Sequence, residues 1–565
     1  MTLLSSLQLG KNALFASQIG LHVAGSNIAN ANTPGYIRQD VVFAPAPTQR
    51  IGNLLLGLGV EVQGIVQRTD RFLEEQTRTA KSDVANGDLQ RQAYLRLEGL
   101  LGELTDTDLS TALTGFFGTL QDVANQPENL SVRNLAVLKG ESLTQDINRL
   151  ASRVTSEQTE INNQIVGAGQ QINEVVNRLG KLNIQIANLE RGDPSRGAAA
   201  SLRQDRTTLL GQLSELVDIR TEEQESGTIS VYSGGDFLVI DGNVRQVEVV
   251  ITPQGGRNLA SIQLDSTNSP LQAQSGKVAG LVAARDDVYG EFLNDLDEFS
   301  RTLAYEFNRV HSSGQGLVGL QEVTSEFSVT DSQRALDDAG LPFVPDNGSL
   351  QVIVHNKFTG LTKTTDVFVR LRGLDDDTSL TDFASDLDAI DGLSATITPQ
   401  GKLSLKSESA DLEFSFANET SGALAALGIN TFFSGSTAST LHVNPAIRAV
   451  PGRLAASQGG IGVDSENIIA LAGMLDRPLE SGDGASLMDL FDRVTAETAQ
   501  SSAVAKSVAD GYQAFHDTLD QQLLAMQGVS LDEEAVRIIA HQRAFQASAR
   551  FIAAVSEVLD ILVSL

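Results

Sequence analysis

The sequence of 565 residues contains no cysteine and no long apolar run. Without cysteine the chain has no disulfide bonds, no thiolate nucleophile and no sulfur ligand for zinc. A membrane-spanning helix needs roughly 18 to 20 apolar residues, and even the apolar tail Phe551 to Leu565 is interrupted by Glu557 and Asp560. The first six residues lack the basic, apolar and small-residue regions of a cleaved signal peptide. The sequence therefore predicts a chain that is cytosolic or is exported uncleaved by another route.

Basic residues are also scarce, since 41 Lys and Arg stand against 71 Asp and Glu and leave a formal net charge of −30. Such a chain repels phosphate backbones and anionic lipid, so we expect neither nucleic acid as a partner nor membrane insertion. The charge is uneven. Residues 1–35 hold one Lys and no acidic residue, and residues 528–565 hold five acidic and three basic residues. Both ends are therefore nearly neutral, while the segment between them is strongly acidic.

Motifs of catalysis and metal binding are missing as well. The six histidines are scattered without the spacing of a metal site, and neither a phosphate loop nor a GxSxG nucleophile elbow occurs. Residues 314–319 match GxGxxG, but they follow a helical pattern and open no helix, so we expect a flexible exit from a domain. The sequence predicts no catalytic residue, no cofactor site and no metal site. A glycosidase-like carboxylate pair stays open as an alternative, although the sequence selects none.

The first 28 residues carry a pattern that predicts a helix with one apolar stripe. Its members follow alternating steps of four and three, and large residues alternate with small ones. Two helices of this kind can approach each other closely. The stripe consists of Leu3, Leu7, Gly10, Leu14, Ser17, Leu21, Ala24 and Ile28.

The end of the chain repeats this pattern over about four heptads. Ser530 and Glu533 have the spacing of a capping box, and the acidic residues 532–534 oppose the positive end of the helix dipole. Gly528 separates this helix from the one before it. The stripe consists of Leu531, Ala535, Ile538, Gln542, Phe545, Ala549, Ile552, Ser556, Leu559 and Val563, widened by Ile539, Val555 and Leu562.

Between the two ends, longer helical patterns alternate with short strand-like runs. We expect helices within residues 71–104, 132–190, 202–216 and 278–311, and strands at residues 228–231, 237–240, 244–251 and 259–264. Two hairpins are expected further on, one from residues 350–355 and 366–372 and one from residues 394–398 and 402–406.

The predicted fold class is mainly α with α+β insertions: terminal coiled-coil helices, an elongated helical bundle domain and an inserted β-rich outer domain. We expect an inner coiled-coil domain from residues 1–50 and 528–565. The helical domain is expected to comprise residues 51–314, with a β-rich segment at 225–275, and residues 456–527. The inserted α+β domain is expected at residues 315–455.

The end of the first helix has an unusual sequence, Ser-Asn-Ile-Ala-Asn-Ala-Asn-Thr-Pro-Gly-Tyr, over residues 26–36. Asparagine side chains cap and turn the backbone, Pro34 pushes Thr33 into an extended conformation, and Gly35 permits dihedrals that other residues resist. This segment resembles the N-terminal signature of the axial rod, hook and hook-associated proteins of the bacterial flagellum. Residues 528–534 and 541–550 are similar to the C-terminus of the same family.

Two internal segments, residues 308–314 and 427–435, together with the chain length, resemble the hook-associated members of this family. The resemblance implies terminal segments that pair as helices in the inner tube of the flagellum, an elongated helical domain outside them, and a surface domain inserted into the chain. It also implies a structural adapter, not an enzyme, at the hook–filament junction. Such a protein is extracellular and leaves the cell by type III secretion without a cleaved signal peptide.

The implied partners are further copies of the chain in a ring, the flagellar hook protein, a second hook–filament junction protein and a flagellar export chaperone. The expected assembly interface combines the two stripes with the end of the signature: Leu3, Leu7, Leu14, Leu21, Ile28, Asn30, Pro34, Gly35, Tyr36, Leu531, Ile538, Phe545, Ile552 and Leu559. The chaperone is expected to bind the last helix through Leu531, Ile538, Phe545, Ile552, Leu559 and Leu562.

Three alternatives remain at the level of sequence. Each stripe can be the core of an ordinary helical bundle. A hook or distal-rod subunit would share the signature at residues 26–36. From a different class, residues 315–455 can be a carbohydrate-binding or hydrolytic domain, which would need a concave site with paired carboxylates.

Overall fold

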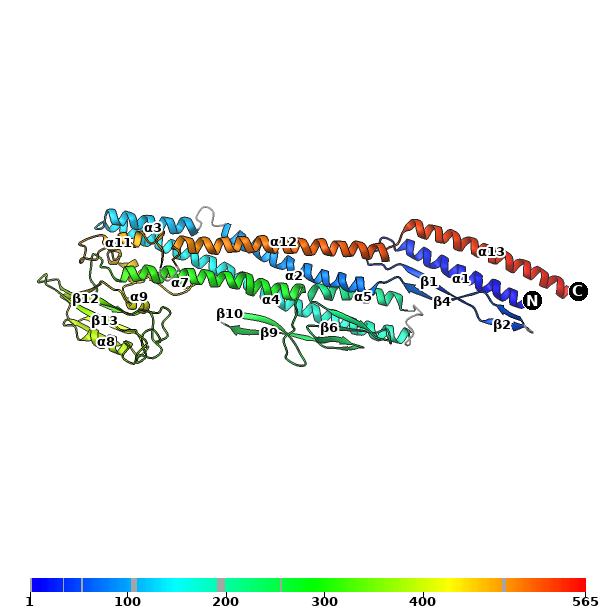
Figure 1. The fold of residues 1–565 in the computed structure, drawn as a ribbon, viewed down its shortest axis with the longest axis horizontal. Helices are drawn as coiled ribbons and strands as arrows, with labels where there is room; N and C mark the ends of the chain where they lie inside the picture. Colours follow the sequence, from blue (N-terminus) through cyan, green and yellow to red (C-terminus); the bar gives the residue numbers. More distant parts are fainter. Residues whose placement is uncertain are drawn as a thin grey trace. The chain divides into compact units, whose positions relative to one another are not determined.

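A computed structural model describes residues 3–33, 35–51, 54–102, 109–190, 199–254, 257–479 and 484–564. The chain forms two compact units. The first comprises residues 1–92, 159–285 and 503–565, and the second comprises residues 93–158 and 286–502. Three long helices contribute to both units, namely α2 (Arg71–Gly102), α4 (Leu130–Glu190) and α12 (Leu487–Gln527) (Figure 1). The predicted fold class, mainly α with α+β insertions, is confirmed.

Helices dominate the first unit. The terminal helices α1 (Leu3–Ala29) and α13 (Leu531–Ser564) lie side by side, and α5 (Ala200–Leu216) and α6 (Gly276–Ala283) pack together. The 61-residue helix α4 confirms the long helical pattern of residues 132–190. Its part in this unit buries a continuous face. Four residues of that face, spaced seven apart, are all 0% exposed: Ile165, Ile172, Leu179 and Ile186.

The strands of the first unit form small antiparallel sheets. Directly after the signature, β1 (Gln39–Pro45) pairs with β4 (Val60–Gln67), and β2 (Thr48–Ile51) pairs with β3 (Leu54–Gly57). The sequence did not predict these strands, because prolines interrupt the run and no clear alternation marks it. A four-stranded sheet follows in the order β5-β6-β7-β8, and β9 pairs with β10. The bounds are Arg220–Glu223 (β5), Ile229–Ser233 (β6), Asp236–Ile240 (β7), Asn243–Val244 (β8), Val247–Gln254 (β9) and Arg257–Leu264 (β10).

The second unit joins a helical part to the inserted domain. Its helices besides the shared ones are α3 (Leu109–Asn125), α7 (Glu291–Ser312) and α11 (Glu466–Ala472), and a π-helical segment, Ala284–Gly290, leads into α7. The insert contains two three-stranded sheets, with the strand orders β13-β12-β16 and β11-β15-β14.

Both hairpins predicted within the insert are confirmed. Leu350 lies opposite Val367 in the first, and Ser394 lies opposite Lys406 in the second. Alternate residues of these strands face a shared apolar core, so Val352, Leu403 and Phe416 are all 0% exposed. The strands are β11 (Glu322–Thr324), β12 (Gly348–Asn356), β13 (Thr362–Val369), β14 (Leu393–Ile397), β15 (Leu403–Ser407), β16 (Leu412–Ala417), β17 (Phe433–Ser434) and β18 (His442–Val443). The short helices are α8 (Leu380–Asp388), α9 (Ala423–Leu427) and α10 (Pro445–Ala449), followed by a 3-10 turn, Pro451–Arg453.

The GxGxxG segment is not the flexible exit that the sequence led us to expect. A Cβ atom on Gly314 would lie 2.1 Å from the side-chain nitrogen of Asn467, and one on Gly316 would lie 2.4 Å from the carbonyl oxygen of Gly452. The Leu317 backbone N–H donates to the same carbonyl at 2.7 Å. These glycines therefore permit close backbone packing, which a string match does not reveal.

Candidate assembly site at the paired termini

The helices α1 and α13 pack in an antiparallel register, so the two ends of the chain form one contact. A Cβ atom on Gly10 would lie 2.7 Å from Cγ1 of Ile552, and one on Gly20 would lie 2.5 Å from Cε1 of His541. Further along, the side chain of Asn27 reaches Glu534. The residue number rises on α1 as it falls on α13. Glycine at these two positions leaves room for the side chains of Ile552 and His541, which pack directly against the backbone of α1.

The predicted stripe of α1 flanks this contact, and small residues fill its centre. The fully buried positions of the stripe are Gly10, Ser17 and Ala24, joined by Gly20. The large residues of the stripe are half-buried: Leu3, Leu7, Leu14, Leu21 and Ile28.

On α13 the predicted residues differ in burial. Ile552 lies against Gly10, whereas Leu531, the first residue of the helix, is 54% exposed. Val555 is buried, and the side chain of Leu562 lies outside the described residues. The half-buried residues of the stripe are Ile538, Phe545, Ile552 and Leu559.

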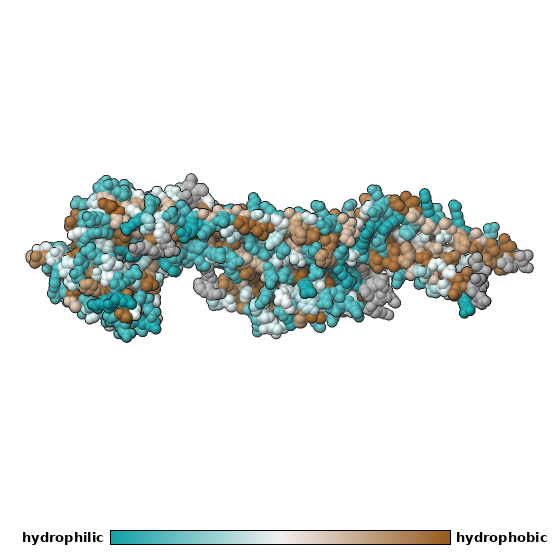
Figure 2. All heavy atoms as spheres, in the orientation of Figure 1, coloured by the Kyte–Doolittle hydropathy of each residue, from teal (hydrophilic) through white to brown (hydrophobic). Residues whose placement is uncertain are grey.

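The outer faces of both helices leave apolar side chains uncovered, which Figure 2 shows as brown patches over the terminal helices. On α1, Leu4 is 74% and Phe15 is 56% exposed. On α13 the exposed apolar residues are Val536, Ile539, Phe551, Val558, Ile561 and Val563. Contiguous apolar surface of this kind is typical of protein interaction sites.

The signature ends α1 with a series of turns. The Asn30 side chain donates to the Ser26 carbonyl at 2.9 Å, and the Thr33 and Tyr36 backbone N–H groups continue the turns. Gly35 has a φ of 74°, in the left-handed region that glycine tolerates best. Pro34, which the sequence assigned to the assembly interface, lies outside the described residues.

A buried polar cluster joins the signature to the start of α13. Asn27 is 0% exposed. Its side-chain amide donates to the Gln39 carbonyl at 2.9 Å and accepts from the Gln39 backbone N–H at 3.0 Å. The same amide donates to Oε2 of Glu534 at 3.1 Å and accepts from the Tyr36 hydroxyl at 2.9 Å. Burial raises the pKa of Tyr36, so its hydroxyl stays protonated and donates. The Asn27 amide is fully satisfied only when both terminal segments are in place.

Arg38 supplies the cation of this cluster. Its Nε donates to Oε1 of Glu534 at 2.9 Å, and the side chains of Arg38 and Glu534 are 4% and 1% exposed. Glu533 also pairs with Arg38, at 2.8 Å, but its side chain is 62% exposed. Burial lowers the pKa of Arg38, and the two carboxylates more than offset this, so its pKa is raised overall. The guanidinium is therefore a permanent buried charge whose counter-ion is supplied by α13.

The cluster continues into the body of the first unit through Gln527, the last residue of α12. Its carbonyl accepts from the Arg38 backbone N–H at 3.0 Å, and its side chain donates to Glu74 at 2.7 Å. Glu74 lies 3.8 Å from the guanidinium of Arg78, which in turn donates to the Thr221 hydroxyl at 3.1 Å. A continuous polar path thus joins the base of the terminal helices to α2 and β5.

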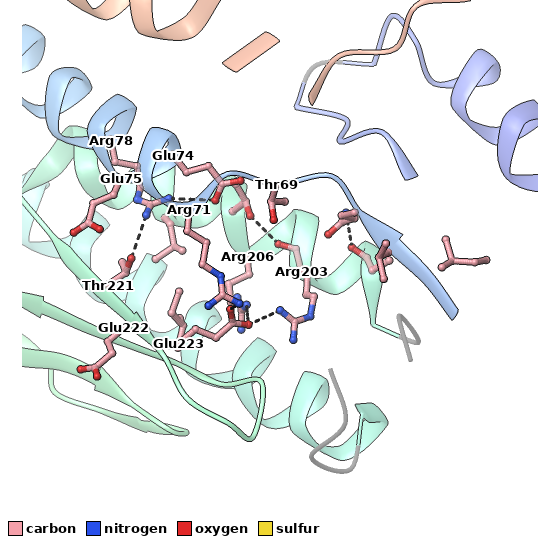
Figure 3. Close-up of a pocket in the computed structure, with 17 residues that line it drawn as sticks. Thr69, Arg71, Glu74, Glu75, Arg78, Arg203, Arg206, Thr221, Glu222 and Glu223 are labelled. Carbon is pink, nitrogen blue, oxygen red and sulfur yellow. Dashed lines mark hydrogen bonds and ion pairs between the residues drawn. The ribbon is translucent and has the colours of Figure 1, made fainter. Parts of the chain in front are cut away.

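Glu74 and Arg78 line a cavity of about 460 Å³ between α2, α5 and β5. Figure 3 shows Arg71, Arg203 and Arg206 directed toward Glu223. The lining includes four arginines (Arg71, Arg78, Arg203, Arg206) and four glutamates (Glu74, Glu75, Glu222, Glu223).

The charges in this cavity balance each other. The Arg203 guanidinium donates hydrogen bonds to the Glu190 carboxylate, which raises the pKa of Arg203, whereas burial lowers the pKa of Arg206 to about 10. Among the described residues, no group of three or more His, Cys, Asp and Glu is arranged to hold a metal ion. The cavity is an ionic junction between helices, and its residues show no division into nucleophile, acid and base.

The second unit brings together the two internal segments noted in the sequence. The Asn308 side chain accepts from the Phe432 and Phe433 backbone N–H groups, each at 3.0 Å. His311 is fully buried, with Nδ1 2.8 Å from the Asn430 carbonyl and Nε2 accepting from the Ala455 N–H at 3.0 Å. Residues 308–314 and 427–435 therefore form one joint, which fixes the base of the insert.

Comparison with known proteins identifies both the body and the ends of the chain. Residues 94–325 match the family model of the flagellar hook-associated protein FlgK helical domain. Residues 7–36 match that of the flagella basal body rod protein, and residues 520–565 match that of the flagellar basal body rod FlgEFG protein C-terminal region. The body of the chain is thus similar to flagellar hook-associated proteins, and its two ends are similar to flagellar rod proteins. The two rod matches cover the helices that pair in the structure, α1 and α13.

Relatives of the hook-associated family include flagellar hook-associated protein 1 of Bacillus subtilis, which is 27% identical over 54% of this chain and 67% of its own length. The protein of the same name from Escherichia coli is 23% identical over 54% of this chain and 56% of its own length. The chain thus spans between half and two thirds of the length of these relatives. The solved structure of the flagellar hook junction protein FlgK from Burkholderia pseudomallei aligns with a TM-score of 0.50 over 81% of this chain and all of that one, at 15% identity, and supports a shared fold.

The sequence missed the residues that tie this site together. Asn27 was expected only to cap the helix, and Glu534 only to oppose the helix dipole. The available signal was the position of Asn27 three residues after Ala24, which places a polar side chain beside the apolar stripe.

Among the described residues, no helix has the length and apolarity to span a membrane.

Proposed function

We propose that this chain is a structural adapter of the bacterial flagellum that forms the hook–filament junction, on which the filament assembles. The pairing of α1 with α13 beside the signature carries this proposal, because it places one apolar, nearly neutral surface at the joined ends of an acidic chain. Copies of the chain form a ring through this surface, which neighbours cover. Residues 1–50 and 528–565 make up the inner domain, and residues 315–455 make up the outer one.

We propose for this chain the partners that the family resemblance implies. The hook protein lies on one side of the ring and a second junction protein on the other. Export without a cleaved signal peptide places the chain outside the cell, and we assign no reaction to it. A flagellar export chaperone binds α13 before assembly, through the stripe from Leu531 to Leu562 before α1 covers that stripe. The apolar residues on the outer face of α13 add to the surface that it can bind. Undiminished chaperone binding after removal of residues 531–565 would contradict this last assignment.

Deleting the gene tests the proposed function. Electron microscopy of the deletion strain should show complete hooks without filaments, and filament protein should accumulate in the culture medium. The wild-type chain supplied in trans should restore filaments. Missing hooks would instead indicate a rod or hook subunit, and normal filaments would overturn the structural role altogether.

Gly20→Ala should loosen the terminal helix pair, because the added methyl group would overlap the His541 ring. Overpacking of this kind costs about 1–3 kcal/mol. Gly25→Ala is the matched control, since no atom lies within 4 Å of its Cβ position, and Ala there favours the helix by up to about 1 kcal/mol. In the complemented deletion strain, Gly20→Ala should increase the amount of filament protein shed into the medium, and Gly25→Ala should not. Adding His541→Ala to Gly20→Ala should return the shedding toward the wild-type level. Equal shedding by the two glycine variants would contradict the close contact.

A further inference from the structure

The turn between β12 and β13 presents the most exposed large apolar side chain of the described residues. Phe358 is 90% exposed, and Leu361 beside it is 71% exposed. The turn itself is well formed, because the Asn356 side chain accepts from the Phe358 and Thr359 N–H groups at 2.9 Å and the Asn356 carbonyl accepts from the Gly360 N–H at 2.8 Å. The phenyl ring is thus held out from the insert on a defined turn, which lowers the entropy lost on binding.

This turn is also locally basic in an acidic protein. Residues 355–363 contain two lysines and no acidic residue, whereas the whole chain carries a net charge of −30. Lys363 pairs with Asp391. Lys357 directly precedes Phe358, is exposed, and has no ion-pair partner within the described part of the chain. A surface that receives Phe358 would therefore gain from a neighbouring carboxylate.

The same unit contains a matching cavity of about 400 Å³ between β11 and α10. Its apolar lining comes from Leu320, Val323 and Ile447. Its charged lining residues are two carboxylates, Glu322 and Glu326, and one guanidinium, Arg453. Oε2 of Glu326 is buried without a hydrogen-bond partner. The Glu322 side chain is 62% exposed and lies 3.8 Å from the Lys406 ammonium, an exposed pair that leaves the other carboxylate oxygen for a second cation. The cavity has room for an aromatic ring, and an exposed carboxylate lies among its lining residues.

A ring of identical subunits needs two different surfaces on each copy, one for each neighbour. We propose that the β12–β13 turn of one copy inserts Phe358 into the cavity between β11 and α10 of the next copy, with Lys357 facing Glu322. The occupant is thus a second copy of this chain. The inference rests on the proposed function, because the ring supplies the neighbour, and it assigns the insert a role in closing that ring.

The absence of cysteine makes the contact testable by disulfide trapping. Phe358→Cys is combined with Ala446→Cys, since Ala446 lines the cavity and is exposed. Purified hook–filament structures from the complemented deletion strain should then give a ladder of covalent multimers on non-reducing gels, and reductant should collapse it to monomer. The matched control combines Phe358→Cys with Asp386→Cys, an exposed position on α8 outside the cavity, and should stay monomeric.

The outcomes separate this inference from the proposed function. Filaments without multimers in the Phe358→Cys/Ala446→Cys strain would overturn the contact and leave the junction role standing. Multimers of equal yield in the Asp386→Cys control would also overturn it, because the trapping would be unspecific. Failure of the wild-type chain to restore filaments to the deletion strain would instead contradict the junction role itself.

Discussion

Cells carrying Glu534→Ala should lose their filaments, whereas cells carrying Glu533→Ala should swim nearly as well as wild type. Removing Glu534 leaves the guanidinium of Arg38, 4% exposed, without its buried counter-ion, and such a loss costs about 3–5 kcal/mol. The Asn27 amide loses a partner at the same time. Glu533 pairs with the same guanidinium, but its side chain is 62% exposed, and exposed pairs contribute about 1 kcal/mol or less.

A motility assay on soft agar, with filament protein measured in the medium, checks this difference. The two substitutions are adjacent in sequence, remove the same charge and affect the same guanidinium. They differ in the burial of the carboxylate and in its hydrogen bond with Asn27. Arg38→Met combined with Glu534→Leu should recover much of the loss, because replacing both buried charges with apolar side chains is often neutral or stabilising. Equal phenotypes for Glu533→Ala and Glu534→Ala would show that the buried cluster does not hold the terminal helices.

Lowering the pH from 6.5 to 4 should reduce the free energy of unfolding of the second unit by about 3 kcal/mol, because one buried histidine becomes protonated. Burial lowers the pKa of His311 to about 4, and the ring nitrogens bond the Asn430 carbonyl and the Ala455 N–H in the neutral form. The folded pKa lies below the unfolded value of about 6.5. The contribution to stability is therefore complete above pH 6.5 and is lost as the pH falls toward 4.

Urea unfolding followed by circular dichroism at pH 7.5 and pH 4.5 measures this effect. Other carboxylates also titrate in this range, so the informative quantity is the difference between wild type and His311→Gln. The variant should be less stable at pH 7.5 and should lose less stability on acidification. His442→Gln serves as the control, because His442 is exposed in the same unit and should leave the pH dependence unchanged. Identical pH dependence in wild type and His311→Gln would contradict the neutral buried imidazole.

Periodicity predicted the elements that bury one face along their whole length. The 61-residue helix α4 shows a repeat long enough to be unambiguous. The hairpin of β14 and β15 was predicted because Pro399-Gln400-Gly401 marks its turn between alternating strands. In contrast, most apolar residues of β1 and β4 are only half-buried, and the strands pair across 15 or more positions, so local pattern did not indicate them.

The candidate site was predicted in outline and missed at its centre. The heptad stripe of α1 included Gly10 but not Gly20, and a Cβ atom at either position would overlap a side chain of α13. Sequence gives Glu533 and Glu534 the same charge in the same helical turn. Only the fold shows that one is exposed and the other buried against Arg38, 496 residues away in the chain.

The most direct test of the junction role is to locate the chain on isolated flagella. Immunogold labelling with an antibody against residues 315–455 should give one compact band where the hook meets the filament, and no label along either. Label distributed along the hook, along the filament or within the rod would contradict the role as a junction adapter.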